Sequence, residues 1–234
     1  MATESSIPHG PSALLTAIIK TIQDKIIPLT QDLVATGGSP FGAAVLTQSS
    51  LETITATVNA YRDSPLLHGE TNCIREFFDT PAEQRPDAST CIFFSTHEPC
   101  ALCLSGIAWT GFPILIFLFS YEYTRDSVAI PEDIEILQEL FRVPVPGDTE
   151  ETLAARPLYN KKNKFFSARS VEELLADVED EEERGRLGTQ IQKIKEVYDQ
   201  FSRDWTASDR QNPWQRHYQG RGAEFPQGEA YLSR

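Results

Sequence analysis

The spacing of apolar residues changes along the chain, and each spacing predicts a different element. Over residues 13–27, apolar side chains recur at steps of three and four, which predicts an amphipathic helix capped by Ser12 and bent or broken at Pro28. Apolar runs of strand length follow at residues 41–47, 54–58, 91–95 and 114–120. The last run is apolar at every position except its end, so we expect a central strand that helices cover on both faces.

Helices are expected around these strands. The pattern places them at residues 68–78, 99–111, 131–141, 170–178 and 179–201. Ser170-Val171-Glu172-Glu173 forms a capping box, which is typical of a helix start. Residues 142–155 are expected to connect two parts of the chain, and residues 205–234, aromatic but without periodicity, to form an extended tail. This order of elements predicts an α/β fold in which helices wrap a mixed sheet.

Two short motifs carry the candidate chemistry. His68-Gly69-Glu70 opens one predicted helix, and Pro99-Cys100-Ala101-Leu102-Cys103 opens another. Zinc is held by imidazole nitrogens and thiolates, and a catalytic zinc site takes three protein ligands and leaves the fourth position to water. The sequence therefore predicts one Zn²⁺ per chain, bound by His68, Cys100 and Cys103.

Glu70 adds a carboxylate beside the predicted metal site. It stands two residues after His68, so in a helix its side chain should point past the metal instead of binding it. Zinc lowers the pKa of a bound water to about 7, and a carboxylate nearby can take up the released proton and pass it to a leaving group. We therefore expect Glu70 to be the catalytic acid and base.

Two other interpretations of the cysteine pair stay open. A C-x-x-C sequence can be a redox pair, although Pro99 before it and His68 upstream favour a metal. A purely structural zinc site would need a fourth protein ligand, for which His97 and Cys91 are the nearby candidates. Without that role, His97 is expected to line the pocket or to pack at its rim.

An H-x-E motif followed by P-C-x-x-C is the signature of zinc-dependent deaminases. Residues 12–140 resemble the cytidine and deoxycytidylate deaminase superfamily, and within it the branch of cytosine, guanine and tRNA-adenosine deaminases. Residues 39–46 look like the first strand of that branch, and residues 105–112 look like the helix after the second motif. The resemblance implies a three-layer α-β-α cytidine-deaminase-like fold. Its catalytic domain would span residues 12–145, and a helical C-terminal extension with an aromatic-rich tail would span residues 146–234.

The resemblance also implies a function. It points to a zinc-dependent hydrolase that removes the exocyclic amine of a small heterocycle and releases ammonia, acting on a free base such as cytosine or guanine, or on a related nucleoside or natural-product ring. Asn59 is implied to hydrogen-bond the substrate ring, although an Asn here can equally serve a turn. The backbone N–H of Gly69 is implied to meet the reacting group. The alternative is a catalytically silent zinc-binding scaffold or partner subunit; such chains often lose the Glu that is present here as Glu70.

Charge and composition narrow the partners. The 234 residues carry a net charge of −13, which repels nucleic acid at long range. The four cysteines do not suggest a disulfide framework and favour a reducing compartment. Neither an apolar stretch of about 18 residues nor a signal-like N-terminus is present. We therefore expect a soluble cytoplasmic protein without a membrane partner, and the resemblance implies a homodimer.

Overall fold

The computed structural model describes residues 9–206, and most of the predicted aromatic tail, from residue 207 on, lies outside this described part. Five strands form one mixed sheet in the order β2-β1-β3-β4-β5. Strand β1 is antiparallel to β2 and to β3, whereas β4 is parallel to both of its neighbours, β3 and β5. The strands are β1 Gly42–Thr47, β2 Thr53–Val58, β3 Cys91–His97, β4 Ile114–Phe119 and β5 Ser167–Ser170.

Helices cover both faces of this sheet. The α-helices of the described residues are α1 Gly10–Thr21, α2 Ile27–Ala35, α3 Gly69–Asp79, α4 Ala101–Thr110, α5 Tyr121–Ser127, α6 Glu132–Ile136, α7 Glu150–Ala155, α8 Val171–Ala176 and α9 Glu181–Thr206. A π-helical turn joins α1 to α2. Pro28 lies in the first turn of α2, where its missing N–H costs little. None of the helices in residues 9–206 is long and apolar enough to cross a membrane.

Alternation along the strands separates two hydrophobic cores. In β1, Ala44 and Leu46 face the core that is completed by α1, α2, α8 and α9. The neighbouring residues Ala43 and Val45 face the second core, which α3 and α4 complete. Successive side chains of a strand point to opposite faces, so one strand serves both cores. The structure confirms the predicted α/β fold: a mixed sheet between two helical layers, with a C-terminal helix.

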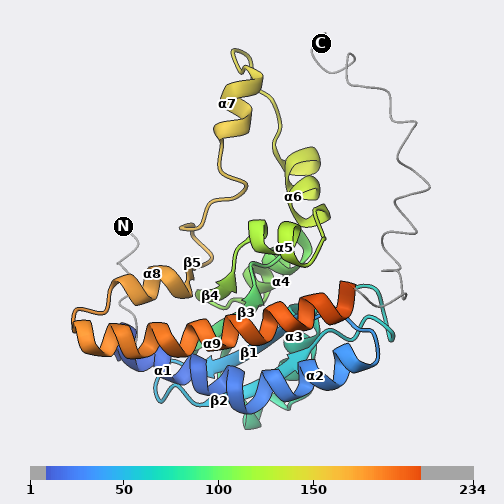
Figure 1. The fold of residues 1–234 in the computed structure, drawn as a ribbon. Helices are drawn as coiled ribbons and strands as arrows, with labels where there is room; N and C mark the ends of the chain where they lie inside the picture. The colour runs from blue at the N-terminus through green and yellow to red at the C-terminus, as the bar shows by residue number, and fades with distance from the viewer. Residues whose placement is uncertain (1–8, 207–234) are drawn as a thin grey trace.

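The C-terminal residues take part in this architecture. Strand β5 extends the sheet at the outer edge of β4, and α9 lies along α1 and α2 over one face (Figure 1). Helix α9 buries one side, which carries Leu187, Ile191, Ile194, Tyr198 and Phe201. The helical part of the expected extension is therefore packed on the sheet of the expected catalytic domain.

Three elements were missing from the sequence-based expectation. Helix α7 lies inside residues 142–155, which were expected to be a connector, and α5 directly follows the central strand. Strand β5, whose sequence is Ser-Ala-Arg-Ser, has one buried residue, Ala168, and no alternating pattern. Its pairing with β4 is a tertiary contact that local sequence does not show.

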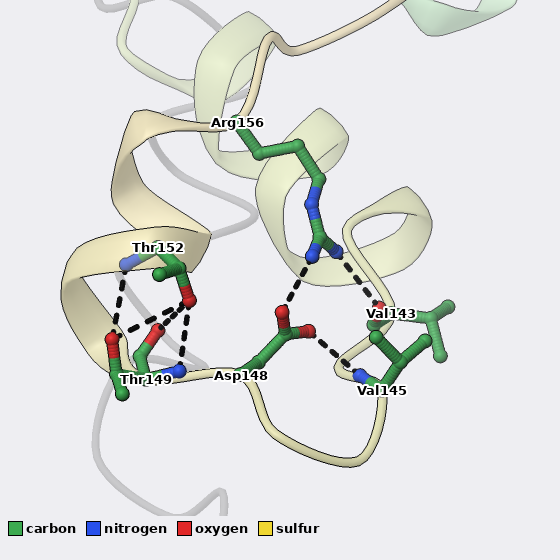
Figure 2. Close-up of polar contacts among 6 residues, drawn as sticks. All are labelled: Val143, Val145, Asp148, Thr149, Thr152 and Arg156. Carbon is green, nitrogen blue, oxygen red and sulfur yellow. Dashed lines mark hydrogen bonds and ion pairs between the residues drawn. The ribbon is translucent and has the colours of Figure 1, made fainter.

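Between α5 and β5 the chain forms an arm, residues 132–160, whose helices α6 and α7 stand away from the sheet (Figure 1). Its tip is closed by Asp148, which accepts hydrogen bonds from the Val145 backbone N–H (2.7 Å) and from Arg156 (2.6 Å), as Figure 2 shows. A reciprocal cap between Thr149 and Thr152 starts α7. The arm is thus an ordered insertion and not a plain linker.

Candidate metal and catalytic site

Two helix starts bring the motif residues together. His68 is the residue before α3, and Cys100 is the residue before α4; both have extended backbone angles. Cys103 lies in the first turn of α4. Both helices pack on the same face of the sheet. The positive ends of their dipoles favour thiolates and carboxylates at this place.

The three expected ligand atoms form one cluster. Sγ of Cys100 lies 3.5 Å from Sγ of Cys103 and 3.5 Å from Nδ1 of His68, and Sγ of Cys103 lies 3.7 Å from the same nitrogen. Ligand atoms around a tetrahedral zinc, with bonds of about 2.0–2.3 Å, lie roughly 3.3–3.8 Å apart. The donor set and its spacing therefore fit zinc.

Glu70 lies beside this cluster as a buried carboxyl, 6% exposed. Ser95 of β3 donates a hydrogen bond to its Oε1 (3.0 Å), and Cys103 donates one to its Oε2 (3.4 Å). Burial, and then the negative charge of Cys100, raise the pKa of Glu70. A carboxyl with a raised pKa can both accept and return a proton near neutral pH.

The thiols and the imidazole influence one another. A hydrogen bond with Cys103, opposed by burial and helped by His68, holds the pKa of Cys100 well below its usual range. Burial raises the pKa of Cys103. Burial alone would lower the pKa of His68, but the hydrogen bond to Cys100 and the charge of Cys100 raise it to about 9. The surroundings of Cys100 therefore favour the thiolate, the form that binds metal.

The two residues expected to contact substrate lie near the ligands but are engaged in the fold. Asn59 follows β2, is 8% exposed, and its Oδ1 accepts a hydrogen bond from the Tyr61 backbone N–H (2.9 Å), which is the turn role left open above. Gly69 packs against β1: an added Cβ would lie 3.0 Å from the Gly42 backbone and from the Phe41 carbonyl oxygen.

In the described residues, no fourth protein ligand accompanies the cluster, as a purely structural zinc site would need. Among residues 9–206, the only group able to hold a metal is His68, Cys100 and Cys103. The His97 ring is buried between Phe41 and Phe119, with ring centroids 4.5 and 5.0 Å away. Cys91 donates a hydrogen bond to the Asp87 carbonyl oxygen (3.4 Å). His97, which was expected to line the pocket or to pack at its rim, lies in an aromatic cluster.

One further carboxyl, Asp133, lies on the helix beside the start of α4. Burial, and then the charges of Cys100 and Glu70, raise the pKa of Asp133, which lies on α6 at the base of the arm. Its neighbour Ile134 packs against the cluster of Ala101, Tyr121 and Leu137, so the helix that carries Asp133 lies beside the start of α4. Its sequence context is an acidic helix start, Pro131-Glu132-Asp133, which gives no sign of this placement.

A family match agrees with the fold and the cluster. Residues 20–119 match the model of the cytidine and deoxycytidylate deaminase zinc-binding region. This region of the chain is similar to the cytidine deaminase-like superfamily. The match and the ligand cluster together indicate zinc as the metal.

Individual relatives are more distant. The chain is 27% identical to a guanine deaminase of Bacillus subtilis over 103 residues, or 44% of this chain and 64% of the relative. It is 29% identical to a probable cytosine deaminase of Schizosaccharomyces pombe over 97 residues, or 41% of this chain and 57% of the relative. The chain thus spans about 60% of the length of these curated relatives. A solved guanine deaminase structure from B. subtilis is 22% identical, covers 62% of this chain and 86% of its own, and superposes with a TM-score of 0.44.

Proposed function

We propose that this protein is a zinc-dependent hydrolytic deaminase, which removes the exocyclic amine of a small heterocycle and releases ammonia. One observation carries the proposal. The Glu70 carboxyl lies in hydrogen-bond contact with Cys103, beside three atoms whose spacing fits a single zinc ion. A metal site with three protein ligands and an adjacent buried carboxyl is suited to activating water.

His68, Cys100 and Cys103 would hold one ion per chain. A zinc ion bound there would act as a Lewis acid and lower the pKa of water to about 7. The helix starts that carry these ligands also direct backbone N–H groups, including that of Gly69, toward the place where charge develops.

Glu70 moves the protons in this mechanism. It takes one proton from the attacking water and delivers it to the ring nitrogen beside the reacting carbon, while the water oxygen forms a bond to that carbon. Glu70 then takes the second proton from that oxygen and delivers it to the exocyclic amine. The bond from the carbon to the exocyclic nitrogen breaks, the carbonyl of the product forms, and ammonia leaves. Ser95 donates a hydrogen bond that fixes Oε1 of Glu70 through these steps.

The proposed substrate class rests on the net charge of the chain and on the family resemblance. A net charge of −13 disfavours nucleic acid, so a free base such as cytosine or guanine, or a related nucleoside or natural-product ring, is the proposed substrate. Asn59 would meet the ring through its amide N–H groups, because its Oδ1 already accepts from Tyr61. The location of this protein in the cytoplasm and its assembly as a homodimer also stay predictions.

Ammonia release tests the function directly. The purified protein, with its zinc content measured, is offered cytosine, guanine, adenine, their nucleosides and a panel of aminopyrimidines and aminopterins. Glu70→Gln should keep zinc and lose turnover by about 10²–10⁴-fold, the usual contribution of a general acid and base. Glu76→Gln, an exposed glutamate on the same helix, is the matched control and should keep full activity. Full activity of Glu70→Gln, or zinc without ammonia from any compound, would contradict the proposal; the second result would favour a silent scaffold.

A further inference from the structure

A second buried carboxylate, Glu98, lies in the turn between β3 and α4, two residues before Cys100. Its side chain is 5% exposed. Its Oε1 accepts a hydrogen bond from the Tyr159 hydroxyl (2.8 Å) and lies 3.5 Å from the Lys161 ammonium. Its Oε2 accepts from the Tyr121 backbone N–H (3.3 Å). Because a buried charge is costly unless it is paired and hydrogen-bonded, these contacts fix where Glu98 can lie.

The same groups hold the next residue of the turn. The Tyr121 hydroxyl donates to the Pro99 carbonyl oxygen (2.6 Å), and the Tyr121 and Tyr159 rings meet edge to face with centroids 6.2 Å apart. The Glu98 backbone N–H donates to the Phe119 carbonyl oxygen at the end of β4 (2.7 Å). The turn that starts α4 is therefore held at residues 98 and 99 by groups from other parts of the chain.

Strand β5 explains how Tyr159 and Lys161 reach this turn. The chain returns from the arm through residues 159–166 and pairs with β4 at Ser167–Ser170. The Ala168 backbone N–H donates to the Lys161 carbonyl oxygen (2.7 Å), which ties Lys161 to the new strand. The Lys161 ammonium lies 4.8 Å from the centroid of the Phe117 ring on β4. A four-residue strand thereby places a cation and a hydroxyl against Glu98.

We propose that Tyr159 and Lys161 are positioning residues for the metal site, acting through Glu98 on the start of α4 and hence on Cys100 and Cys103. The inference rests on the proposed function in one respect, that these cysteines bind zinc. If either partner is removed, part of the Glu98 charge becomes uncompensated, and the turn must shift to hydrate it. A metal site tolerates displacements of only about 0.5 Å in its ligands, so a small shift of Cys100 weakens binding.

Both residues lie outside residues 20–119, the part that matches the deaminase family. The arm and β5 are thus not appendages to the site but part of its support. In this chain the zinc-binding turn depends on a segment that begins about sixty residues after it.

Zinc affinity measured by competition with a chromogenic chelator tests this proposal without any substrate. The variants are Tyr159→Phe and Lys161→Gln in the full chain. Tyr123→Phe is the matched control for the first, because the Tyr123 hydroxyl donates over the same distance, 2.8 Å, to the carboxylate of Asp199 on α9 and not to Glu98. Lys195→Gln, which loses an ion pair with Glu172 on the far helices, controls for the second.

We expect Tyr159→Phe and Lys161→Gln to weaken zinc binding by about tenfold or more, as loss of groups that support metal ligands usually does, and both controls to stay within about twofold of the unmodified protein. When Co²⁺ replaces zinc, the visible absorption of the Tyr159→Phe protein should differ from that of the unmodified protein. The absorption of the Tyr123→Phe protein should not. Equal thermal midpoints of the metal-free Tyr159→Phe and Tyr123→Phe proteins would show that general destabilisation is not the cause.

Unchanged zinc affinity in Tyr159→Phe, or an equal loss in Tyr123→Phe, would overturn the proposal. The zinc-affinity test can fail or succeed independently of the test of deaminase activity. A protein that binds zinc with the expected pattern but deaminates nothing refutes the proposed function alone. A protein whose activity depends on Glu70, but whose zinc affinity ignores Tyr159, refutes the positioning role alone. A protein that binds no zinc refutes both.

Discussion

At the scale of single residues, the site contains two carboxyls whose surroundings favour the protonated form. Glu70 comes from α3, and Asp133 comes from α6 at the base of the arm. Burial is the main cause of both pKa increases, followed by the negative charge of Cys100. Pairs of titratable groups with shifted pKa values are typical of sites that move protons. We predict that Asp133 is a second group that hydrogen-bonds the substrate ring or the departing amine.

We expect Asp133→Asn to lower kcat/KM by about 10–100-fold while zinc content stays unchanged, because the carboxyl acts on the substrate and not on the metal. Steady-state kinetics on the best substrate of the ammonia assay provide the measurement. The exposed Glu135 on the same helix offers the control Glu135→Gln, which should behave like the unmodified protein. If Asp133→Asn instead lost its zinc, Asp133 would support the metal site and not the substrate.

His97 leads to a prediction about pH and stability. Burial among aromatic rings lowers its pKa to about 3, so the folded protein keeps it neutral. The unfolded chain takes up the proton near pH 6.5, and stability is therefore lost as pH falls from about 6.5 toward 3. Between pH 7 and pH 5 this residue alone should cost about 2 kcal/mol of unfolding free energy.

Denaturant unfolding of the unmodified protein and of His97→Met at both pH values measures this effect. The Met variant fills a similar space without a titratable group, so its stability should fall by about 2 kcal/mol less over the same pH interval. Parallel losses in the two proteins would show that His97 does not titrate on unfolding as its burial implies.

At the scale of elements, the site depends on the approach of the α3 start to β1. The Gly69 Cα faces the backbone of Gly42 and Phe41, and an added Cβ would lie 3.0 Å from three backbone atoms there. Backbone atoms cannot rotate away as a side chain can, so a methyl group at this position must push α3 outward. His68 and Glu70 flank this position and would move with it.

Gly69→Ala should therefore destabilise the fold by about 1–3 kcal/mol, the usual cost of overpacking, and weaken zinc binding as well. Thermal unfolding with and without zinc measures both effects. Gly185→Ala in α9 is the opposite control: an added Cβ there meets no atom within 4 Å, so the change should stabilise the helix by up to about 1 kcal/mol. A Gly69→Ala protein as stable as the unmodified one would show that α3 can shift at no cost.

The elements also show where local sequence is informative. The capping box at Ser170 predicted α8 correctly, because the cap consists of neighbouring residues: Ser170 accepts from the Glu173 N–H, and Glu173 accepts from the Ser170 N–H. Strand β5, directly before it, gave no signal, because its hydrogen bonds go to β4, more than fifty residues earlier. Propensity describes neighbours along the chain, whereas sheet pairing joins distant segments.

At the scale of the whole molecule, α4 has an apolar outer face. Trp109 is 93% exposed and Leu102, two turns earlier on the same side, is 43% exposed. A helix that is apolar all round is usually buried, and an exposed Trp is common at the centre of protein interfaces. We predict that this face of α4 meets its counterpart in the homodimer that the family resemblance implies.

Light scattering and sedimentation should therefore find a dimer, and Trp109→Lys should shift it toward monomer by raising the dissociation constant at least about tenfold, as loss of a central aromatic contact does. Leu29→Lys is the control, because Leu29 is also exposed, at 41%, but lies on α2, in the helical layer on the other face of the sheet. A monomer in the unmodified protein, or a dimer that Trp109→Lys leaves intact, would contradict this assignment.

The sequence by itself determined the strands with strong apolar runs, the starts of α3, α4 and α8, and the three residues that cluster. Those features depend on neighbouring residues: the period of apolar positions, the caps, and the fixed spacing of His68 to Glu70 and of Cys100 to Cys103. The cap expected at Ser12 was wrong, because α1 begins at Gly10 after His9. Tertiary structure decided the rest. It brought α3 and α4 to one face of the sheet, placed the helix of Asp133 beside the start of α4, put His97 among aromatic rings, and carried Tyr159 and Lys161 to Glu98. These relations join residues far apart in the chain, and only the packing of the sheet and its two helical layers sets the distances between them.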